Sequence, residues 1–333
     1  VLRTDWGPHF VTEEAIRYNR TQNPGDCGSA NFACFYMCGD TGRRLDESAS
    51  PGRRLGIGAE LDMYANSICL ASKRNQTIFF RMKRWSWRDS TFCGQLGPDE
   101  HHLACYFGPD TYCKGPFPAK QKDKYRFTEM MKARCTKSEQ LGAMEYIFRH
   151  PTERFMSKAE EAARSVFGPA GAPRNLISVH IRWGDKWKEA KLFPISDYID
   201  RVKKVADHCR IPSPSVFLMS EDPAAIARFQ KEAPAGWSIL YYKAAVQPGN
   251  LSRTENDRPM ESPDVYAGKS GGSDGLYSFI AMVISLEAVG FVTTWSSTWS
   301  RVWLRLIEAR AFQREDGCAR IDVKRGQVIP KRR

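Results

Sequence analysis

The sequence predicts an α/β fold, and three observations support this prediction. Strand-like apolar runs alternate with helical patterns through the second half of the chain, which is the order of a parallel βαβ arrangement. One of these runs, residues 176–181, ends abruptly in a charged loop. The first half is less regular and rich in cysteine. The chain has 333 residues, enough for two domains, which we expect at residues 1–168 and 169–333.

The first half shows helical periodicity in a few segments, separated by turn formers. In chain order, it is expected to contain a helix over residues 12–18, a helix that begins after Gly56-Ile57-Gly58, a strand over 77–80, and helices over 139–148 and 151–167.

The second half alternates more regularly. The expected elements are strand 176–181, helix 196–208, strand 216–219, helix 223–231, strand 239–242, helix 276–289, strand 291–294 and helix 299–306. Between them lies a long polar segment, residues 243–275, and loops of that length are usually functional or mobile. The basic tail, with Lys324-Arg325 and residues 331–333, is expected to be disordered.

The net charge of +12 indicates either an anionic partner, such as phosphate, an acidic glycan or nucleic acid, or simply a basic surface. Nucleic acid is not expected, because no zinc-finger spacing and no aromatic stacking platform accompany the basic residues. No apolar run approaches the roughly 20 residues of a membrane helix. Any membrane anchor or targeting segment is therefore expected outside this sequence.

Ten cysteines are concentrated in the first half. They are Cys27, Cys34, Cys38, Cys69, Cys93, Cys105, Cys113, Cys135, Cys209 and Cys318. An even number with this distribution favours disulfides in an oxidising compartment. Cys34 and Cys38 have a zinc-like spacing, but no second well-spaced pair follows, so disulfides are preferred and no metal is expected. Three glycosylation sequons, at Asn19, Asn75 and Asn250, also favour a luminal protein.

The charged loop after residues 176–181 is the first candidate site. Arg182 and Lys186 suit an anionic ligand, because a guanidinium binds two phosphate oxygens and an ammonium adds a point charge. Asp185 or Glu189 can hold or activate a neutral partner. In open α/β sheets ligands bind at the carboxyl ends of the strands. The alternative is a solvated loop with a surface ion pair.

Three further segments suggest contacts to a nucleotide. Gly56 and Gly58 precede a helix, where glycine lets backbone amides approach a phosphate, although such a pair also makes ordinary tight turns. Trp87 can stack on a base or a sugar, or simply be buried. Ser296 and Ser297 lie between a strand and a helix, as phosphate ligands or as an N-cap.

These segments together resemble α1,6-fucosyltransferases. The block His180-Ile181-Arg182-Trp183-Gly184-Asp185-Lys186, with Glu189 and residues 193–198, resembles the first motif of that family. Residues 217–223 resemble the second motif, an apolar strand that ends in two acids and a proline. Thr294-Trp295-Ser296-Ser297 with Arg301 resembles the third. Residues 23–27, 56–58 and 85–87 extend the likeness over nearly the whole chain.

The resemblance implies a GT-B-like architecture, in which two Rossmann-like domains face a cleft, with residues 1–168 on the acceptor side and residues 169–333 as the nucleotide-sugar-binding domain. The implied donor substrate is GDP-fucose, which is used without a metal cofactor. The residues that it implies for the donor are His180 at guanine, Arg182 at the β-phosphate, and Gly56, Gly58, Trp87, Asp222, Ser296 and Ser297 at further positions of the nucleotide. It also implies that Glu189 is the general base, with Lys186 close to it. The Golgi lumen is the implied location, with the full-length chain a type II membrane protein.

The chain departs from the family at several positions. Trp183 replaces a second arginine, Gly184 replaces a threonine, Phe193 replaces a histidine, and the path from Lys186 to residue 194 is one residue shorter. The guanine-binding aspartate has no clean counterpart, since gapless counting reaches Ala281 and Asp274 fits only with a shift.

The sequence therefore predicts a metal-independent, inverting glycosyltransferase. Its expected reaction is the transfer of fucose from GDP-fucose to a glycan or glycoprotein acceptor, with α1,6 linkage to a core N-glycan as one form. Two alternatives remain open: a different donor sugar, and a catalytically silent relative that binds a glycan or a nucleotide.

Overall fold

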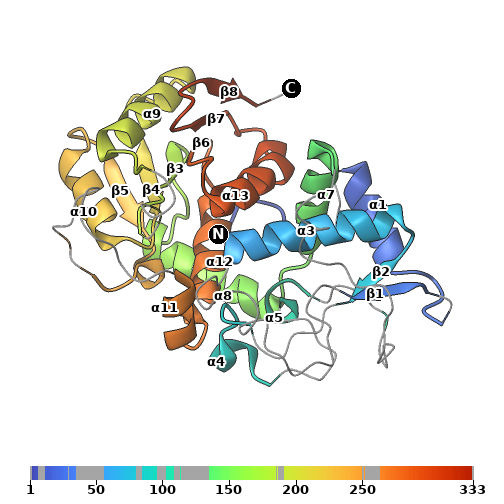
Figure 1. Cartoon of the computed structure of the whole chain (residues 1–333). Coiled ribbons are helices and arrows are strands. Elements are labelled where there is room, and N and C mark those ends of the chain that lie inside the picture. Colours follow the sequence, from blue (N-terminus) through green and yellow to red (C-terminus); the bar gives the residue numbers. More distant parts are fainter. Residues whose placement is uncertain are drawn as a thin grey trace.

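A computed structural model describes residues 2–6, 12–28, 30–34, 56–79, 85–95, 103–108, 113, 135–184, 186, 191–249, 251 and 263–331. A six-stranded sheet organises the C-terminal half (Figure 1). Its strands are β3 (Leu176–His180), β4 (Ser215–Met219), β5 (Ser238–Tyr241), β6 (Gly290–Thr293), β7 (Ala319–Asp322) and β8 (Val328–Pro330).

The strand order is β5-β4-β3-β6-β7-β8, and all neighbours are parallel except β7 and β8. This is the doubly wound order of Rossmann folds, in which the chain runs outward from β3 to β5 and then returns to β6. The order reverses between β3 and β6. Ligands of open α/β sheets bind beyond the carboxyl ends of the two strands at that point.

Helices cover both faces of the sheet, so its central strands β3, β4 and β6 are buried on both sides. Helices α9 (Ile195–His208) and α10 (Pro223–Glu232) pack on the face that presents Ile177, Val179 and Val292. The opposite face presents Leu176, Phe217 and Phe291. It is covered by α8 (Glu153–Phe167), α12 (Ser273–Ser285) and α13 (Thr298–Ala309).

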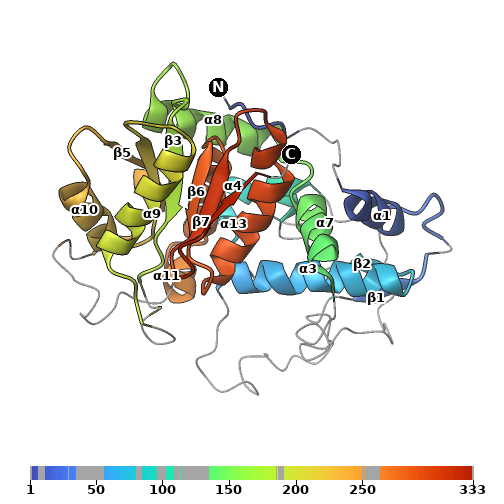
Figure 2. The same cartoon turned by 90° about the horizontal axis from the view of Figure 1, so that it is seen from above.

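The N-terminal half has less strand and more helix among its described residues. It contains α1 (Glu13–Gln22), β1 (Phe32–Cys34), α3 (Ile57–Lys73), β2 (Thr77–Phe79), α4 (Ser90–Cys93), α5 (Ala104–Phe107) and α7 (Lys137–Ile147). Strands β1 and β2 form a parallel pair. Figure 2 shows α1, α3 and α7 beside the larger sheet, with α3 extending from α13 toward β1 and β2. Thr136 and Glu139 form a reciprocal capping box that fixes the start of α7.

A continuous apolar core joins the two halves. It includes Leu61 and Ile68 of α3, Met144 of α7, Phe279 of α12 and Trp303 of α13. Arg305 of α13 adds a polar link, because its guanidinium pairs with Asp62 of α3 and donates to Gln140 Oε1 of α7 at 2.8 Å. The two halves therefore pack directly on each other through α3, α7 and α13.

The α/β fold class is confirmed, and most predicted helices and strands are found within a few residues of their expected bounds. The GT-B-like arrangement of two Rossmann-like domains stays a prediction. The division into residues 1–168 and 169–333 stays a prediction. Two expectations were wrong. The first is that residues 243–275 form one long loop. The segment contains a 3₁₀ turn (Lys243–Ala245), α11 (Pro263–Lys269) and the start of α12, while residues 252–262 lie outside the described part.

The basic residues near the C-terminus were also expected to be disordered, but Lys324, Arg325 and Lys331 lie between and directly after the sheet strands β7 and β8, while residues 332–333 lie outside the described part. Lys324 and Arg325 lie in the turn that joins them, and their amides donate to Asp322 Oδ1 at 3.1 and 3.0 Å. Ala319 and Ile321, which alternate with charged residues in β7, are fully buried. Their burial stabilises a segment whose charged composition suggests exposure to solvent.

The prediction of disulfides is confirmed. Four pairs are described: Cys27–Cys113, Cys69–Cys135, Cys93–Cys105 and Cys209–Cys318. Cys38 and the side chain of Cys34 lie outside the described part. The last pair joins the end of α9 to the residue just before β7, which ties that strand of the sheet to the helix that covers it.

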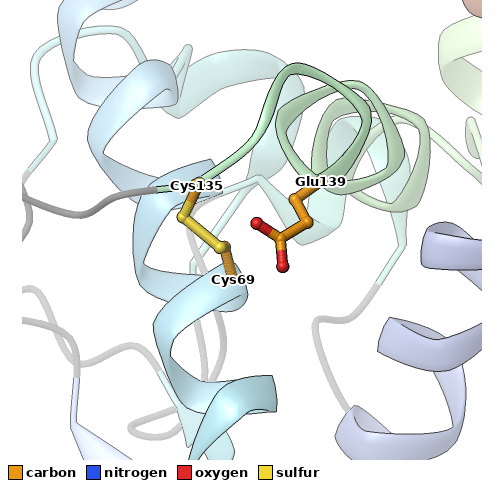
Figure 3. A group of neighbouring side chains, drawn as sticks. All are labelled: Cys69, Cys135 and Glu139. Carbon is orange, nitrogen blue, oxygen red and sulfur yellow. A yellow bond between two sulfur atoms is a disulfide. The ribbon is translucent and has the colours of Figure 1, made fainter.

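One cluster of potential metal ligands occurs among the described residues, at Cys69, Cys135 and Glu139 (Figure 3). Its two sulfur atoms are joined in a disulfide, so neither is a thiolate ligand. Burial tends to raise the pKa of Glu139, but the Thr136 amide and the Lys73 ammonium oppose it and leave the pKa below its usual value. This cluster is a structural link between α3 and α7. Within the described part, no helix is both long enough and apolar enough to cross a bilayer.

Candidate functional site

A pocket lies at the carboxyl edge of the large sheet, where the strand order reverses between β3 and β6. Elements from both halves of the chain line it. The lining residues used below are Gly56, Gly58 and Trp87 from the N-terminal half, and His180, Arg182, Glu221, Tyr242, Gln247, Asp274, Ala281, Ser297, Thr298 and Trp299 from the C-terminal half.

Two helix N-termini meet at this pocket. Helix α3 begins after Gly56 and helix α13 begins after Ser297, and neither N-cap residue forms a side-chain hydrogen bond to its helix. The first amides of both helices therefore have no cap from their own N-cap side chains. Since a helix N-terminus carries partial positive charge and unpaired N–H groups, the pair forms an electropositive wall suited to an anion.

Gly58 makes this meeting of helices sterically possible. A β-carbon at that position would overlap the backbone of Thr298 and Trp299 at the start of α13. Any side chain there would push the two helix N-termini apart. The sequence predicted that Gly58 lets backbone amides approach a phosphate, and this stays a prediction. What the structure shows at Gly58 is a requirement of helix packing, which brings both sets of amides to one pocket.

Arg182 follows β3 and directs its guanidinium into the pocket. It forms an ion pair with Glu221, which follows the neighbouring strand β4, and both side chains are largely buried. Gly184 allows this arrangement, because its φ is +43° and a β-carbon there would lie 2.5 Å from Glu221 Oε1. The pair fixes the direction of the cation while leaving it on the pocket wall.

His180 is a neutral hydrogen-bonding group at the floor of the pocket. Its Nδ1 lies 2.6 Å from Ser300 Oγ, which accepts the Thr294 amide at 3.1 Å. The Ser300 hydroxyl can donate to Nδ1, and in that tautomer the imidazole carries its own hydrogen on Nε2, the nitrogen that can donate to a ligand. Burial, together with the nearby Arg182 cation, lowers the pKa of His180 to about 3.

Asp222 and Trp183 support the loop that carries Arg182. Asp222 is fully buried, caps α10 through Ala224 N at 3.0 Å, and accepts the Gly184 amide at 3.1 Å. Trp183 is also fully buried, within the core between the sheet and α9 and α10. Its indole Nε1 donates to Phe193 O at 2.9 Å, which closes the base of the segment between them.

Helix α12 contributes a carboxylate and a small residue to the same wall. Asp274 and Ala281 are seven residues apart, two helical turns, and both line the pocket. Burial raises the pKa of Asp274, and a hydrogen bond from Ser270 Oγ at 2.9 Å partly opposes this. The two positions considered for a base-binding aspartate therefore lie on one face of one helix.

The structure brings six of the predicted site residues to the pocket: Gly56, Gly58, Trp87, His180, Arg182 and Ser297. Three others lie away from the pocket lining, and the fourth, Glu189, is not among the described residues. Ser296 is exposed at the turn before α13, and Asp222 is buried behind the pocket wall. Lys186 donates its amide to Trp183 O at 2.9 Å and does not line the pocket.

Sequence reasoning missed Glu221, Ser300 and Tyr242. Glu221 had the same signal as Arg182, a charge directly after a buried strand, but only the adjacency of β3 and β4 makes them partners. Ser300 has no local signal, because its role depends on α13 crossing below His180. Tyr242 follows β5 and its ring packs edge-on to that of Tyr277 at 6.0 Å.

No family model and no curated protein sequence matches the chain. Its structure is similar to two crystal structures of NodZ alpha-1,6-fucosyltransferase, one co-crystallized with GDP and the other soaked with GDP-fucose. The first has 14% sequence identity and a TM-score of 0.49, and the second 14% and 0.48. Each comparison covers 90% of this chain and 98% of the other.

Proposed function

We propose that the protein is a metal-independent, inverting glycosyltransferase that transfers fucose from GDP-fucose to a glycan. The observation that carries this proposal is the convergence of Arg182 and the N-termini of α3 and α13 on one pocket at the carboxyl edge of the sheet. This arrangement is suited to a diphosphate, and the order of motifs along the chain favours GDP-fucose among its carriers.

The pocket offers separate groups for the separate parts of a nucleotide. The amides at the start of α13, the Ser297 hydroxyl and Arg182 take the phosphates. His180 Nε2 and the Asp274 carboxylate take polar edges of the base, while Trp87 and Tyr242 provide aromatic surface. A guanine edge presents both acceptors and donors, so a neutral histidine and a carboxylate are complementary to it.

The chemistry of transfer fits this distribution of charge. An acceptor hydroxyl attacks the anomeric carbon, its oxygen forms the new glycosidic bond, and the bond from that carbon to the β-phosphate breaks. The electron pair leaves with GDP, and Arg182 and the helix amides stabilise the charge that develops there. A carboxylate takes the hydroxyl proton, and we assign this role to Glu189 on the motif resemblance. Attack opposite the leaving group inverts the configuration.

The experiment is a transfer and hydrolysis assay of the purified protein with a panel of nucleotide sugars, with and without a chelator, and with GDP affinity measured by calorimetry. We expect turnover of GDP-fucose that the chelator does not remove. Arg182→Ala is expected to weaken GDP binding about tenfold or more, since a charge-assisted bidentate contact is lost. Glu189→Gln is expected to abolish transfer and keep GDP binding.

Matched controls are available on the exposed surface of α8. Arg164→Ala and Glu161→Gln remove the same charges away from the pocket and are expected to behave as the parent does. If Arg182→Ala binds GDP as tightly as Arg164→Ala, the phosphate assignment is wrong. Turnover of another donor in place of GDP-fucose favours a different sugar specificity. GDP binding with no turnover of any donor favours the silent relative.

The proposed location is the Golgi lumen, with a membrane anchor outside this sequence. The four disulfides support an oxidising compartment. The test is the glycosylation state of Asn19, Asn75 and Asn250 in the protein purified from its own cells. Modification of any of these sequons by an endoglycosidase-sensitive glycan supports a luminal route, and a cytosolic pool with free thiols contradicts it.

A further inference from the structure

An exposed tryptophan lies beside the pocket and has no role in nucleotide binding as described above. Trp295 follows β6 and is 41% exposed. Three large apolar side chains are exposed among the described residues, and Trp295 is the aromatic one. The Ser297 amide donates to Thr294 O at 2.8 Å, so residues 294–297 form a turn with Trp295 near its tip. Ser297, two residues further, lines the pocket.

The backbone of Trp295 is held in place by a neighbouring loop. The Asp322 carboxylate, at the end of β7, accepts the Trp295 amide on Oδ2 at 2.6 Å. Its other oxygen accepts the amides of Lys324 and Arg325. Asp322 is only 8% exposed, so these bonds are sheltered from water. One buried carboxylate thereby joins the loop after β6 to the loop after β7.

Arg325 completes the arrangement. Its guanidinium carbon lies 5.1 Å from the centre of the Trp295 ring, which is within the range of a cation–π contact. The indole is thus fixed at its backbone by Asp322 and at its ring by Arg325, although it remains exposed. A side chain that is already held in one position loses less conformational entropy when a ligand binds. An exposed aromatic ring held in this way is typical of a binding surface.

We propose that Trp295 and Arg325 form an acceptor subsite, in which a pyranose ring of the acceptor glycan stacks on the indole. This inference rests on the proposed glycosyltransferase function and names where its second substrate binds. The C–H bonds on one face of a pyranose contact the electron-rich face of an aromatic ring, while the ring hydroxyls are acceptors for a guanidinium. The subsite lies on the β7 side of the pocket, across from Glu221 and Tyr242.

A sugar fits this surface better than a protein partner does. The described residues show one exposed aromatic side chain here, next to charged and polar groups, and no broad apolar patch. Stable protein interfaces bury about 800 Å² on each partner around an apolar centre, which is far more than one indole provides. A single ring of saccharide requires one aromatic platform and a few polar contacts.

The test compares Trp295→Ala, Trp295→Phe and the control Ile16→Ala, which shortens an exposed apolar side chain on α1. Calorimetry measures the affinity of each protein for GDP and, separately, for a free core N-glycan, and a glycan array extends the panel of probes. We expect Trp295→Ala to weaken glycan binding about five- to tenfold and to leave GDP affinity unchanged. Trp295→Phe is expected to keep most of the glycan affinity.

The outcomes separate this inference from the proposed function. Equal glycan binding by the parent and Trp295→Ala overturns the subsite, as does a parent that binds no glycan in the panel. Equal loss of GDP and glycan affinity places Trp295 in the donor site and also overturns it. GDP binding by the parent and its loss in Arg182→Ala report on the donor site in the same experiments, whatever Trp295 does.

Discussion

The ion pair between Arg182 and Glu221 places opposite charges in a site that is proposed to bind a diphosphate. The carboxylate fixes the guanidinium, which reduces the reorganisation needed when a phosphate arrives. It also brings negative charge to the same wall. The position of this negative charge depends on the length of the Glu221 side chain. Its Oε1 occupies the space beside Gly184, where no β-carbon would fit.

Gly184→Ala tests this steric coupling. The new β-carbon overlaps Glu221 Oε1, and the alanine must adopt the positive φ of this position. The variant is therefore expected to lose about 1–2 kcal/mol of unfolding free energy. Glu221→Asp shortens the carboxylate by one methylene and opens that space. In the double variant the two losses are therefore expected to be less than additive in urea denaturation. Strict additivity would show that the two residues do not compete for the same volume.

The histidine at the pocket floor makes stability depend on pH. His180 has a pKa of about 3 in the folded protein and an ordinary value near 6.5 when unfolded, so only the unfolded chain binds this proton between these values. Its stabilising contribution is complete above pH 6.5 and is lost as pH falls, at about 1.4 kcal/mol per pH unit.

His180→Gln removes this proton-binding group. The unfolding free energy of the variant, measured from pH 7 to pH 4, is expected to fall less steeply than that of the parent by about that slope. His208→Gln, at the exposed end of α9, is the control. Identical slopes for the parent and His180→Gln would mean that the imidazole is not held neutral by its surroundings.

At the level of secondary-structure elements, the site depends on two helices that begin at the same point. Helix α3 comes from the first half of the chain and α13 from the second, and Gly58 sets their separation. Each N-terminus contributes partial positive charge over about one turn, so a few ångströms of separation decide whether both act on one ligand.

Gly58→Ala is expected to push the two helices apart. We expect a loss of about 2 kcal/mol of stability, from overlap with the backbone of Thr298 and Trp299, and weaker GDP binding. Gly56→Ala is the matched control for stability, because nothing lies within 4 Å of a β-carbon there. Denaturation and calorimetry of the two variants compare one added methyl group at two positions at the start of α3. Equal stability of the two would refute the packing role of Gly58.

The elements that the sequence predicted well have continuous apolar runs or regular helical periods. Strand β3 is buried along its whole length, and its run of apolar residues ends at a charge that indicated the site. Strand β7 was missed because Ala319-Arg320-Ile321-Asp322 has only four residues, two of them charged, and no continuous apolar run. The Arg320 guanidinium is paired with Glu308 of α13 at 2.5 Å, a tertiary contact without local signal.

The same distinction applies to the site. Arg182 and Gly58 were found because a strand end and a glycine before a helix are local patterns. Glu221 and Ser300 act through partners 39 and 120 residues away in the chain, so their roles follow from strand order and helix crossing. Trp183 was read as a departure within the donor site, whereas its side chain belongs to the core behind it.

At the scale of the whole molecule, a disulfide links the large sheet to one of its covering helices. The Cys209–Cys318 disulfide joins residues 109 positions apart and holds α9 against the start of β7. Replacing both cysteines by serine is expected to lower the unfolding free energy by about 2–4 kcal/mol, because the unfolded chain regains its freedom. Urea denaturation of the double variant measures this change.

The Cys93–Cys105 pair serves as the comparison, since it closes a sequence separation of only 12. Its replacement by serine is expected to have the smaller effect if chain entropy dominates. A larger loss at the short loop would indicate that native contacts around α4 and α5, rather than loop length, decide the outcome.

The hydrogen bond from Trp183 Nε1 to Phe193 O has a consequence for how such a protein can diversify. It pins both ends of the intervening segment to the core, and Asp222 anchors the Gly184 amide beside it. Both anchors lie outside the stretch between Gly184 and Phe193. We therefore expect a change of length within that stretch to leave Arg182 in place.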